Sequence, residues 1–280
     1  MVESGKFDAL CASSGDTFAK VQALISKMGS SLVAFSGGVD STLVLKVAKD
    51  ILGPKVTAFT ALSPSVAPEE QAEAAVLCRQ MGVPHVTVQS NELADPQYVA
   101  NAPSRCYFCK TELYSLCAKK RTELGLQVIL DGFNADDFKD HRPGHRAAQE
   151  HGVRSPLAEA GMTKDMVRAW SRRLGLQTWD KPQLACLASR IPYGTAVTQD
   201  RLVQIGSAES ELRGLGLRTF RVRYHGDVAR LEISAEEYPL FSSEELRQKV
   251  NLALQRRGFK FVAVDLEPFR TGRMNDELPR

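Results

Sequence analysis

The sequence predicts an α/β fold: a parallel sheet with helices on both faces, followed by a smaller C-terminal α+β domain. Three observations indicate this. Short apolar runs alternate with helical patterns, a glycine turn joins the first run to a helix, and the alternation changes near residue 195. A chain of 280 residues can hold two domains of modest size. We therefore expect one domain over residues 1–195 and a second over residues 196–280.

The elements of the first domain follow in chain order. Apolar residues at helical spacing predict an opening helix over 18–28, and a proline followed by two acidic residues at 68–70 predicts a helix N-terminus. We expect the segment 91–109, which contains Pro96 and Pro103, to be irregular. In full, the expected helices span 18–28, 40–52, 68–81, 110–124 and 163–174, and the expected strands span 32–35, 56–59, 86–88 and 128–130.

The C-terminal domain has a different order of elements. We expect a helix over 199–215, strands over 220–224 and 229–233, a helix over 243–257 and a strand over 261–265. This order forms an α-β-β-α-β unit rather than a continuation of the strand–helix alternation. A boundary near residue 195 follows from that change.

Composition and charge exclude several classes of protein. The chain is 43% hydrophobic and 25% charged, which is ordinary for a globular protein. It has no run of about 18 apolar residues, and its N-terminus lacks the pattern of a secretory signal, so we expect a cytoplasmic protein with no membrane partner. The net charge of +3 does not call for a nucleic-acid partner.

The hexapeptide Ser-Gly-Gly-Val-Asp-Ser at 36–41 is the most informative motif. Gly37 and Gly38 allow a tight turn that brings backbone N–H groups close to a ligand. The helix that follows offers unpaired N–H donors and a positive dipole end, which suit a phosphate, and Ser36 and Ser41 add hydroxyl donors. For a glycine-rich turn alone, a serine-capped helix is an equally good interpretation.

Three carboxylates lie where Mg²⁺ could be held against those phosphates. Asp40 would repel a bare polyphosphate, and it is suited to capping the helix or to binding a phosphate-bound Mg²⁺. Asp136 and Asp137 follow the expected strand at 128–130, so they lie at the same edge of the sheet. A surface turn rich in Asp and Asn is the alternative interpretation of that second segment.

Three of the six cysteines form a candidate metal site. Cys106 and Cys109 are spaced so that both thiolates can bind one metal or cluster, and Cys186 is a distant third ligand. Three thiolates suit a [4Fe–4S] cluster that leaves one iron open. A redox disulfide, direct thiol chemistry and zinc are the alternatives. The other cysteines are interpreted as inert: Cys78 and Cys117 on apolar helix faces, and Cys11 in a polar N-terminal stretch.

Arginines concentrate in the C-terminal part of the chain. Arg221 and Arg223 project from the same face of an expected strand, where two guanidinium groups can grip a phosphate or a carboxylate. Arg190, Arg270 and Arg273 complete the set. Any one of them alone would be interpreted as a solvated surface arginine.

The hexapeptide in its strand–turn–helix context resembles the pyrophosphate loop of the PP-loop superfamily, the N-type ATP pyrophosphatases, and it lacks the lysine of a Walker A loop. The segment at 131–137 resembles the second nucleotide-site segment of the same enzymes. The resemblance implies a sheet like that of the adenine nucleotide α-hydrolases, and cleavage of ATP to AMP and pyrophosphate with adenylation of a substrate oxygen. The ATP-binding residues that it implies are Ser36, Gly37, Gly38, Asp40, Ser41, Ala61 and Gly132.

Further motifs resemble the LarE family of sulfur transferases within that superfamily. They are Arg-Pro-Gly at 142–144, the loop from Cys186 to Thr195, the strand motif at 221–225, and Phe-Arg-Thr-Gly-Arg-Met-Asn at 269–275. LarE proteins adenylate a carboxylate of pyridinium-3,5-biscarboxylic acid mononucleotide and convert it to a thiocarboxylate, for the nickel-pincer nucleotide cofactor of lactate racemase. One branch of the family sacrifices a single cysteine. The other holds a [4Fe–4S] cluster on three cysteines, and this chain matches the second.

That resemblance assigns roles to the remaining residues. It implies Mg²⁺ on Asp40 with Asp136 or Asp137, the substrate phosphate on Arg221 and Arg223, and Arg190 near the adenylate. It also implies that the C-terminal domain binds substrate and supports a homo-oligomer, with a hexamer as one form. A PP-loop tRNA thiolase and a non-catalytic module that senses nucleotide or iron–sulfur are the alternative functions. The first would carry a basic RNA-binding surface, and the second would release no pyrophosphate.

Overall fold

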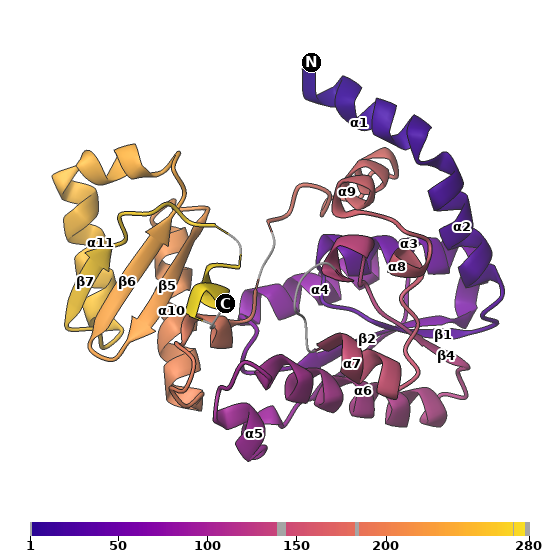
Figure 1. Ribbon diagram of the computed structural model, residues 1–280, viewed down its shortest axis with the longest axis horizontal. Helices are drawn as coiled ribbons and strands as arrows, with labels where there is room; N and C mark the ends of the chain where they lie inside the picture. Colours follow the sequence, from indigo (N-terminus) through magenta and orange to yellow (C-terminus); the bar gives the residue numbers. More distant parts are fainter. Residues whose placement is uncertain (1, 139–143, 183–184, 271, 278–280) are drawn as a thin grey trace. The chain divides into compact units, whose positions relative to one another are not determined.

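The computed structural model of the protein describes residues 2–138, 144–182, 185–270 and 272–277 (Figure 1). The chain forms two compact units, each with its own core. The N-terminal unit comprises Met1–Ser63, Pro68–Glu92 and Cys106–Leu184, and the C-terminal unit comprises Pro64–Ala67, Leu93–Arg105 and Ala185–Arg280. Two short segments from the first half of the chain therefore pack with the C-terminal unit, an interleaving that no sequence pattern predicts.

The N-terminal unit is built on a four-stranded parallel sheet, as predicted. Its strands are β1 (Ser31–Ala34), β2 (Val56–Leu62), β3 (His85–Gln89) and β4 (Val128–Leu130), in the spatial order β3-β2-β1-β4. The chain runs from β1 outward through β2 and β3 and then returns to place β4 on the other side of β1. Ligands of such sheets bind at this reversal, beyond the carboxyl ends of β1 and β4.

Helices cover both faces of this sheet, because successive side chains of each strand point to opposite faces (Figure 1). Val33 and Leu130 belong to a core shared with one set of helices, while Leu32 and Ile129 pack with another. The first set is α2 (Gly15–Ser26), α3 (Val39–Leu52), α4 (Pro68–Gln80), α8 (Pro156–Glu159) and α9 (Lys164–Arg173), and the second is α6 (Arg105–Glu123) and α7 (Gly144–Glu150).

Two predictions about residues 1–195 are wrong. The segment 91–109 is not irregular: it contains α5 (Pro96–Val99) and the start of α6. The prolines were expected to break structure, but Pro96 stands in the first turn of α5, where a missing N–H costs nothing, and Pro103 precedes α6.

The N-terminal stretch is the second correction. It forms the helix α1 (Val2–Ser13), which packs against α9, and Cys11 on it is buried rather than set in a polar stretch. Its sequence lacks a clear amphipathic pattern, so this helix depends on tertiary contact.

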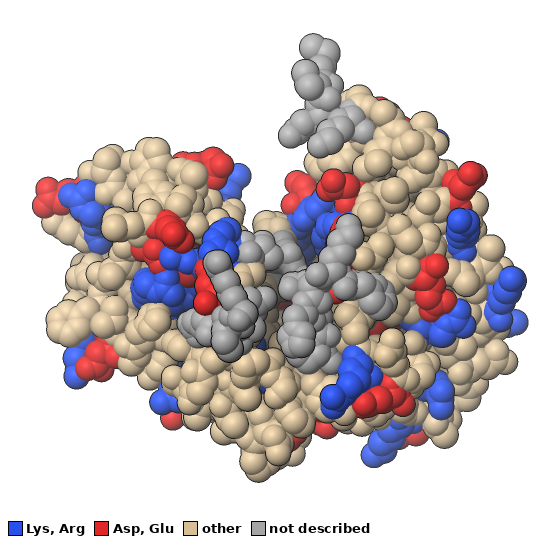
Figure 2. Space-filling model, in the orientation of Figure 1, with Lys and Arg blue, Asp and Glu red and all other residues tan. Residues whose placement is uncertain are grey.

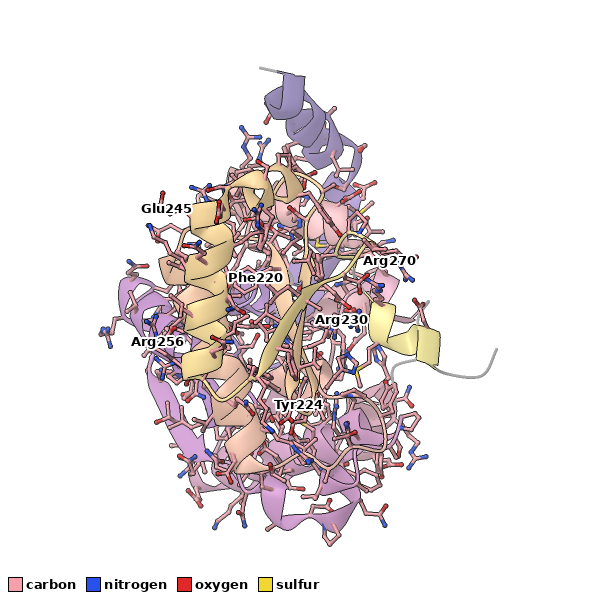
Figure 3. The ribbon with its side chains drawn as sticks, turned by 90° about the vertical axis from the view of Figure 1, so that its left-hand side faces the viewer. Phe220, Tyr224, Arg230, Glu245, Arg256 and Arg270 are labelled. Carbon is pink, nitrogen blue, oxygen red and sulfur yellow. The ribbon has the colours of Figure 1, made fainter. Side chains whose placement is uncertain are left out.

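The C-terminal unit has the predicted α-β-β-α-β order. Its elements are α10 (Gln199–Gly214), β5 (Phe220–His225), β6 (Val228–Ile233), α11 (Glu244–Arg256) and β7 (Phe261–Val264). The central strand β6 pairs antiparallel with β5 and parallel with β7. Figure 3 shows α11, marked by Glu245 and Arg256, beside the sheet whose strand β5 is marked by Phe220 and Tyr224.

Short 3-10 helices complete the description of the chain. They are η1 (Gly53–Lys55), η2 (Glu92–Ala94), η3 (Ala135–Phe138), η4 (Leu187–Arg190), η5 (Tyr238–Ser242) and η6 (Arg273–Glu277). Among the described residues, none of the helices is long and apolar enough to cross a bilayer. Of the motifs noted in the sequence, Arg142, Pro143 and Thr271 lie outside the described residues.

Candidate functional site

The hexapeptide at 36–41 follows β1 and runs into the first turn of α3, as predicted. Gly37 has a φ of +71°, a conformation that favours glycine, and a Cβ there would lie 3.3 Å from Ala74 Cβ on α4. The Gly38 N–H donates to Ser36 Oγ at 3.3 Å, and the hydroxyls of Ser36 and Ser41 are 3.2 Å apart. One backbone donor and two hydroxyls thus meet at the N-terminus of α3, which suits an anion.

The segment after β4 meets this loop. A Cβ on Gly132 would lie 2.7 Å from the Ser41 backbone nitrogen, so only glycine allows the two segments to approach so closely. Asn134 Nδ2 donates to Asp40 Oδ1 at 3.0 Å. The structure therefore brings together the two segments that the sequence had placed at one edge of the sheet. Ala61 lies near the carboxyl end of β2, at that same edge.

The three predicted Mg²⁺ ligands all have protein partners. Asp136 Oδ2 accepts from the Lys164 backbone N–H at 2.8 Å, and Asp137 Oδ2 accepts from the Asn134 N–H at 3.0 Å. Among the described residues, no three His, Cys, Asp or Glu side chains converge to hold a metal. Mg²⁺ usually takes only one or two carboxylates and fills its shell with phosphate and water, so Asp40 beside the loop fits a phosphate-bound ion.

Two lysines at the loop were missed by the sequence reasoning. Lys164 is the first residue of α9, and its ammonium group donates a hydrogen bond to Asp40. Lys181 donates to the Gly37 carbonyl at 3.1 Å and to Glu73 on α4 at 2.8 Å. The signal available in the sequence was indirect: the loop lacks a lysine of its own, so cations from elsewhere in the chain were to be expected.

The cysteines divide by accessibility into the two predicted sets. Cys106 is exposed and Cys109 half-buried, three residues apart in the first turns of α6, and Cys186 is half-buried immediately before η4. Residues three apart lie on one helix face. The remaining cysteines, Cys11, Cys78 and Cys117, are buried.

Burial also decides which thiols are reactive. It raises the pKa of Cys78 and Cys117 to about 12 each and raises that of Cys11, which keeps all three protonated. Cys11, Cys78 and Cys117 are therefore poor thiolate ligands, in line with their interpretation as inert. Cys106 and Cys109 belong to the N-terminal unit and Cys186 to the C-terminal unit, so their joint site stays a prediction.

Arg190 lies inside the C-terminal unit. Its guanidinium donates to both carboxylate oxygens of Glu209, at 2.8 and 3.0 Å, and the side chains are 2% and 0% exposed. Burial opposes the charge of Glu209, but Arg190 and then Arg221 outweigh it, so the pKa of Glu209 lies below its usual value. In this arrangement Arg190 shapes the loop from Cys186 onward, since it also donates to the Cys186 carbonyl at 3.0 Å.

Arg223 and Arg230 line a cavity of about 230 Å³ within the C-terminal unit. Arg223 donates to Glu232 at 2.6 Å and to the Ser189 carbonyl at 2.6 Å, and its Nε has no hydrogen-bond partner among the described residues. Arg273 reaches the same cavity. The cavity thus combines several guanidinium groups with one buried carboxylate, which suits an anionic ligand.

The other predicted arginines have internal contacts. Arg221 is buried, its guanidinium 4.7 Å from the Phe269 ring centre, and Arg270 pairs with Asp276. On the face shown in Figure 2, basic and acidic side chains lie intermingled rather than in one extended basic area. This distribution gives no support to nucleic-acid binding on that face.

Comparison with known proteins finds one matching family and several relatives. A family model described as asparagine synthase matches residues 27–213. An uncharacterised protein of Synechocystis sp. is 45% identical over 249 residues, 89% of this chain and 93% of the relative. The pyridinium-3,5-bisthiocarboxylic acid mononucleotide synthase of Lactiplantibacillus plantarum is 41% identical over 249 residues, 89% of this chain and 90% of the relative. An uncharacterised protein of Methanocaldococcus jannaschii is 24% identical over 240 residues, 86% and 90% of the two chains.

Proposed function

The chain belongs to the asparagine synthase family of PP-loop enzymes and, within it, to the group that contains the Lactiplantibacillus plantarum synthase, and on that basis we propose its reaction. It is an ATP-dependent sulfur transferase that adenylates a carboxylate of pyridinium-3,5-biscarboxylic acid mononucleotide and converts it to a thiocarboxylate. The product serves the biosynthesis of the nickel-pincer nucleotide cofactor.

One observation carries this proposal: the extent of the similarity to that synthase. The 249 aligned residues exceed the span of the family model, so the similarity reaches into the C-terminal unit with its arginine-lined cavity. An ATP loop alone would be shared by many enzymes with other substrates. Similarity through both units favours the same acceptor.

The activation half of the reaction belongs to the N-terminal unit. The phosphates of ATP would lie on Ser36–Ser41, where two hydroxyls meet, and Asp40 with Asp136 or Asp137 would hold Mg²⁺ against them. A carboxylate oxygen of the acceptor attacks the α-phosphorus, and the bond to pyrophosphate breaks. The acyl adenylate that results has AMP as its leaving group. Lys164, which pairs with Asp40 at the loop, adds positive charge beside the departing pyrophosphate.

The sulfur half follows on that adenylate. Sulfide attacks the carbonyl carbon, a C–S bond forms, and AMP leaves with the original oxygen. Cys106, Cys109 and Cys186 would hold a [4Fe–4S] cluster, which would supply the bound sulfide. Arg223, which lines the cavity, would anchor the phosphate of the mononucleotide, whereas Arg221, the second predicted anchor, packs against Phe269. Arg190 orders the loop that presents Cys186. We also propose that the protein is cytoplasmic and forms a homo-oligomer. Light scattering would measure the mass of that oligomer.

Pyrophosphate release tests the proposal directly. The protein, ATP, Mg²⁺ and sulfide are incubated with the biscarboxylic mononucleotide or with a matched mononucleotide that lacks the carboxylates. We expect pyrophosphate only with the carboxylate substrate, and a thiocarboxylate product by mass spectrometry. Pyrophosphate release without the acceptor, or no release with it, would contradict the proposed function.

The cluster is tested separately by Cys106→Ala. We expect about four iron atoms and four sulfides per wild-type chain after anaerobic purification, and loss of both with loss of turnover in the variant, while ATP binding persists. Cys117→Ala, which removes a buried thiol from the same helix, is the matched control and should keep its iron. A Cys106→Ala protein with normal turnover would exclude the three-cysteine mechanism.

A further inference from the structure

We infer that Lys181 is a positioning residue for ATP: by holding the Gly37 carbonyl, it turns the Gly38 N–H toward the phosphates. The inference rests on the proposed use of this loop for ATP. It begins from a contact across the chain, in which Lys181 Nζ lies 3.1 Å from the Gly37 oxygen. Lys181 comes from the segment after α9, far from the loop in sequence, so this contact exists only in the folded N-terminal unit.

The direction of the Gly38 N–H follows from the geometry of the peptide bond. In a trans peptide the C=O and the N–H point to opposite sides of the chain. When Lys181 holds the Gly37 carbonyl on one side, the Gly38 N–H must point to the other. There it meets Ser36 Oγ at 3.3 Å, beside the Ser41 hydroxyl. The Gly38 N–H and the two serine hydroxyls therefore lie together on one side of this peptide, and the Gly37 carbonyl, which would repel phosphate, lies on the other.

The loop needs such a restraint because glycine stands on both sides of this peptide. Gly37 and Gly38 can adopt conformations that are closed to other residues, so the peptide between them can rotate at little cost. A rotated peptide would point the Gly37 oxygen at the phosphates. Fixing it beforehand removes an ordering cost from ATP binding.

Lys181 is itself held in place. The Arg168 guanidinium on α9 donates to the Trp179 carbonyl at 2.7 Å and to the Lys181 carbonyl at 2.9 Å. Glu73 on α4 accepts from the Lys181 ammonium at 2.8 Å, and the Lys181 side chain is only 13% exposed. Arg168 on α9 thus holds the backbone of Lys181, and Glu73 on α4 holds its ammonium group.

The test compares variants of Lys181 for binding of the non-hydrolysable α,β-methylene analogue of ATP, measured by calorimetry on the full chain. Lys181→Met keeps the aliphatic stem and removes the donor, and we expect affinity to fall by about ten- to hundredfold, the range of a charged hydrogen bond. Lys181→Gln keeps a donor without the charge and should lose less. Lys181→Arg keeps a charged donor and should retain most of the wild-type affinity for the analogue.

Two controls separate positioning from general effects. Lys46→Met removes an exposed lysine from α3, the helix that the loop begins, and should bind the analogue like wild type. Glu73→Gln removes the acidic partner but leaves the Gly37 contact, and should bind no more weakly than wild type. KM for ATP should rise in Lys181→Met, while affinity for the acceptor mononucleotide stays unchanged.

Wild-type affinity in Lys181→Met, or an equal loss of affinity for ATP and acceptor in both Lys181→Met and Lys181→Gln, would overturn the inference. In either case the wild-type protein would still release pyrophosphate with the carboxylate acceptor, so the proposed function would stand. Failure of the proposed function shows instead as a wild-type protein that releases no pyrophosphate with the carboxylate acceptor.

Discussion

The charged residues of the two units differ in burial, and the difference separates two roles. At the ATP loop, Lys164 and Asp40 pair while 27% and 21% exposed, so water and a ligand can reach both. In the C-terminal unit, Arg190 and Glu209 pair while almost fully buried. The first kind of pair can exchange its partner for a phosphate or a metal. The second kind cannot, because either charge left alone in the interior would be costly.

The same contrast assigns different consequences to mutation. Breaking a buried pair should reduce the stability of the fold, and changing the loop should reduce affinity for ATP.

Glu209→Ala should have the largest effect. It removes two hydrogen bonds to Arg190 and one to the Val222 N–H, and it leaves Arg190 and Arg221 as neighbouring buried cations. We expect the free energy of unfolding to fall by about 3–5 kcal/mol, measured by urea denaturation. Glu209→Gln, which keeps the shape, should lose less. A loss below about 1 kcal/mol in Glu209→Ala would mean that the pair is not structural.

Gly132→Ala should mainly affect ATP binding. The added methyl would lie 2.7 Å from the Ser41 nitrogen and 3.1 Å from the Asp40 carbonyl carbon, both backbone atoms of the loop. We expect affinity for ATP to fall about tenfold, or about 1.4 kcal/mol. Gly15→Ala, at a position with open space around it, is the matched control. Equal ATP affinity in the two variants would contradict the close approach.

One carboxyl in each unit should respond oppositely to pH. Burial raises the pKa of Glu92 in the N-terminal unit, so its contribution is fully present below about pH 4 and is lost as pH rises toward the folded pKa. Asp265 in the C-terminal unit behaves in reverse. Although burial opposes its charge, hydrogen bonds from the Glu267 N–H, Arg273 and Arg230 lower its pKa to about 2. Its contribution is present above about pH 4 and is lost as pH falls toward 2.

Urea unfolding curves of two variants measure these signs. Glu92→Gln should gain stability relative to wild type as pH rises from 4 to 7. Asp265→Asn should be less stable than wild type at pH 7, with the difference shrinking as pH falls below 4. A Glu92→Gln difference that does not depend on pH would show that the buried carboxyl does not ionise in this range.

The smallest effect is expected at the exposed pair of Lys46 and Asp50 on α3. Their nitrogen and oxygen are 2.7 Å apart, but both side chains are open to water. Lys46→Met should change the free energy of unfolding by only about 0.3–0.5 kcal/mol, measured as for Glu209→Ala. A loss of stability as large as that of Glu209→Ala would show that burial does not decide how much an ion pair contributes to stability.

Much of the fold could be predicted from the sequence, because the local spacing of apolar residues indicates strands and helices. The four parallel strands, the glycine loop before α3 and the order of the C-terminal unit were all confirmed. The helix α1 and the start of α6 at Arg105 were missed, since neither has a strong pattern of its own. In both segments the local sequence does not decide between helix and coil, and packing against the rest of the unit does.

The candidate site divides along the same line. Local motifs in the sequence were enough to predict the phosphate loop, the paired cysteines Cys106 and Cys109 and the arginines of β5. Folding, by contrast, brings Lys164 and Lys181 to the loop and pairs Arg190 with Glu209. These contacts join residues distant in the chain, and no local spacing encodes which distant side chains will meet. The physical reason is burial: it is set by the packed core, and it determines which charges stay available to a ligand.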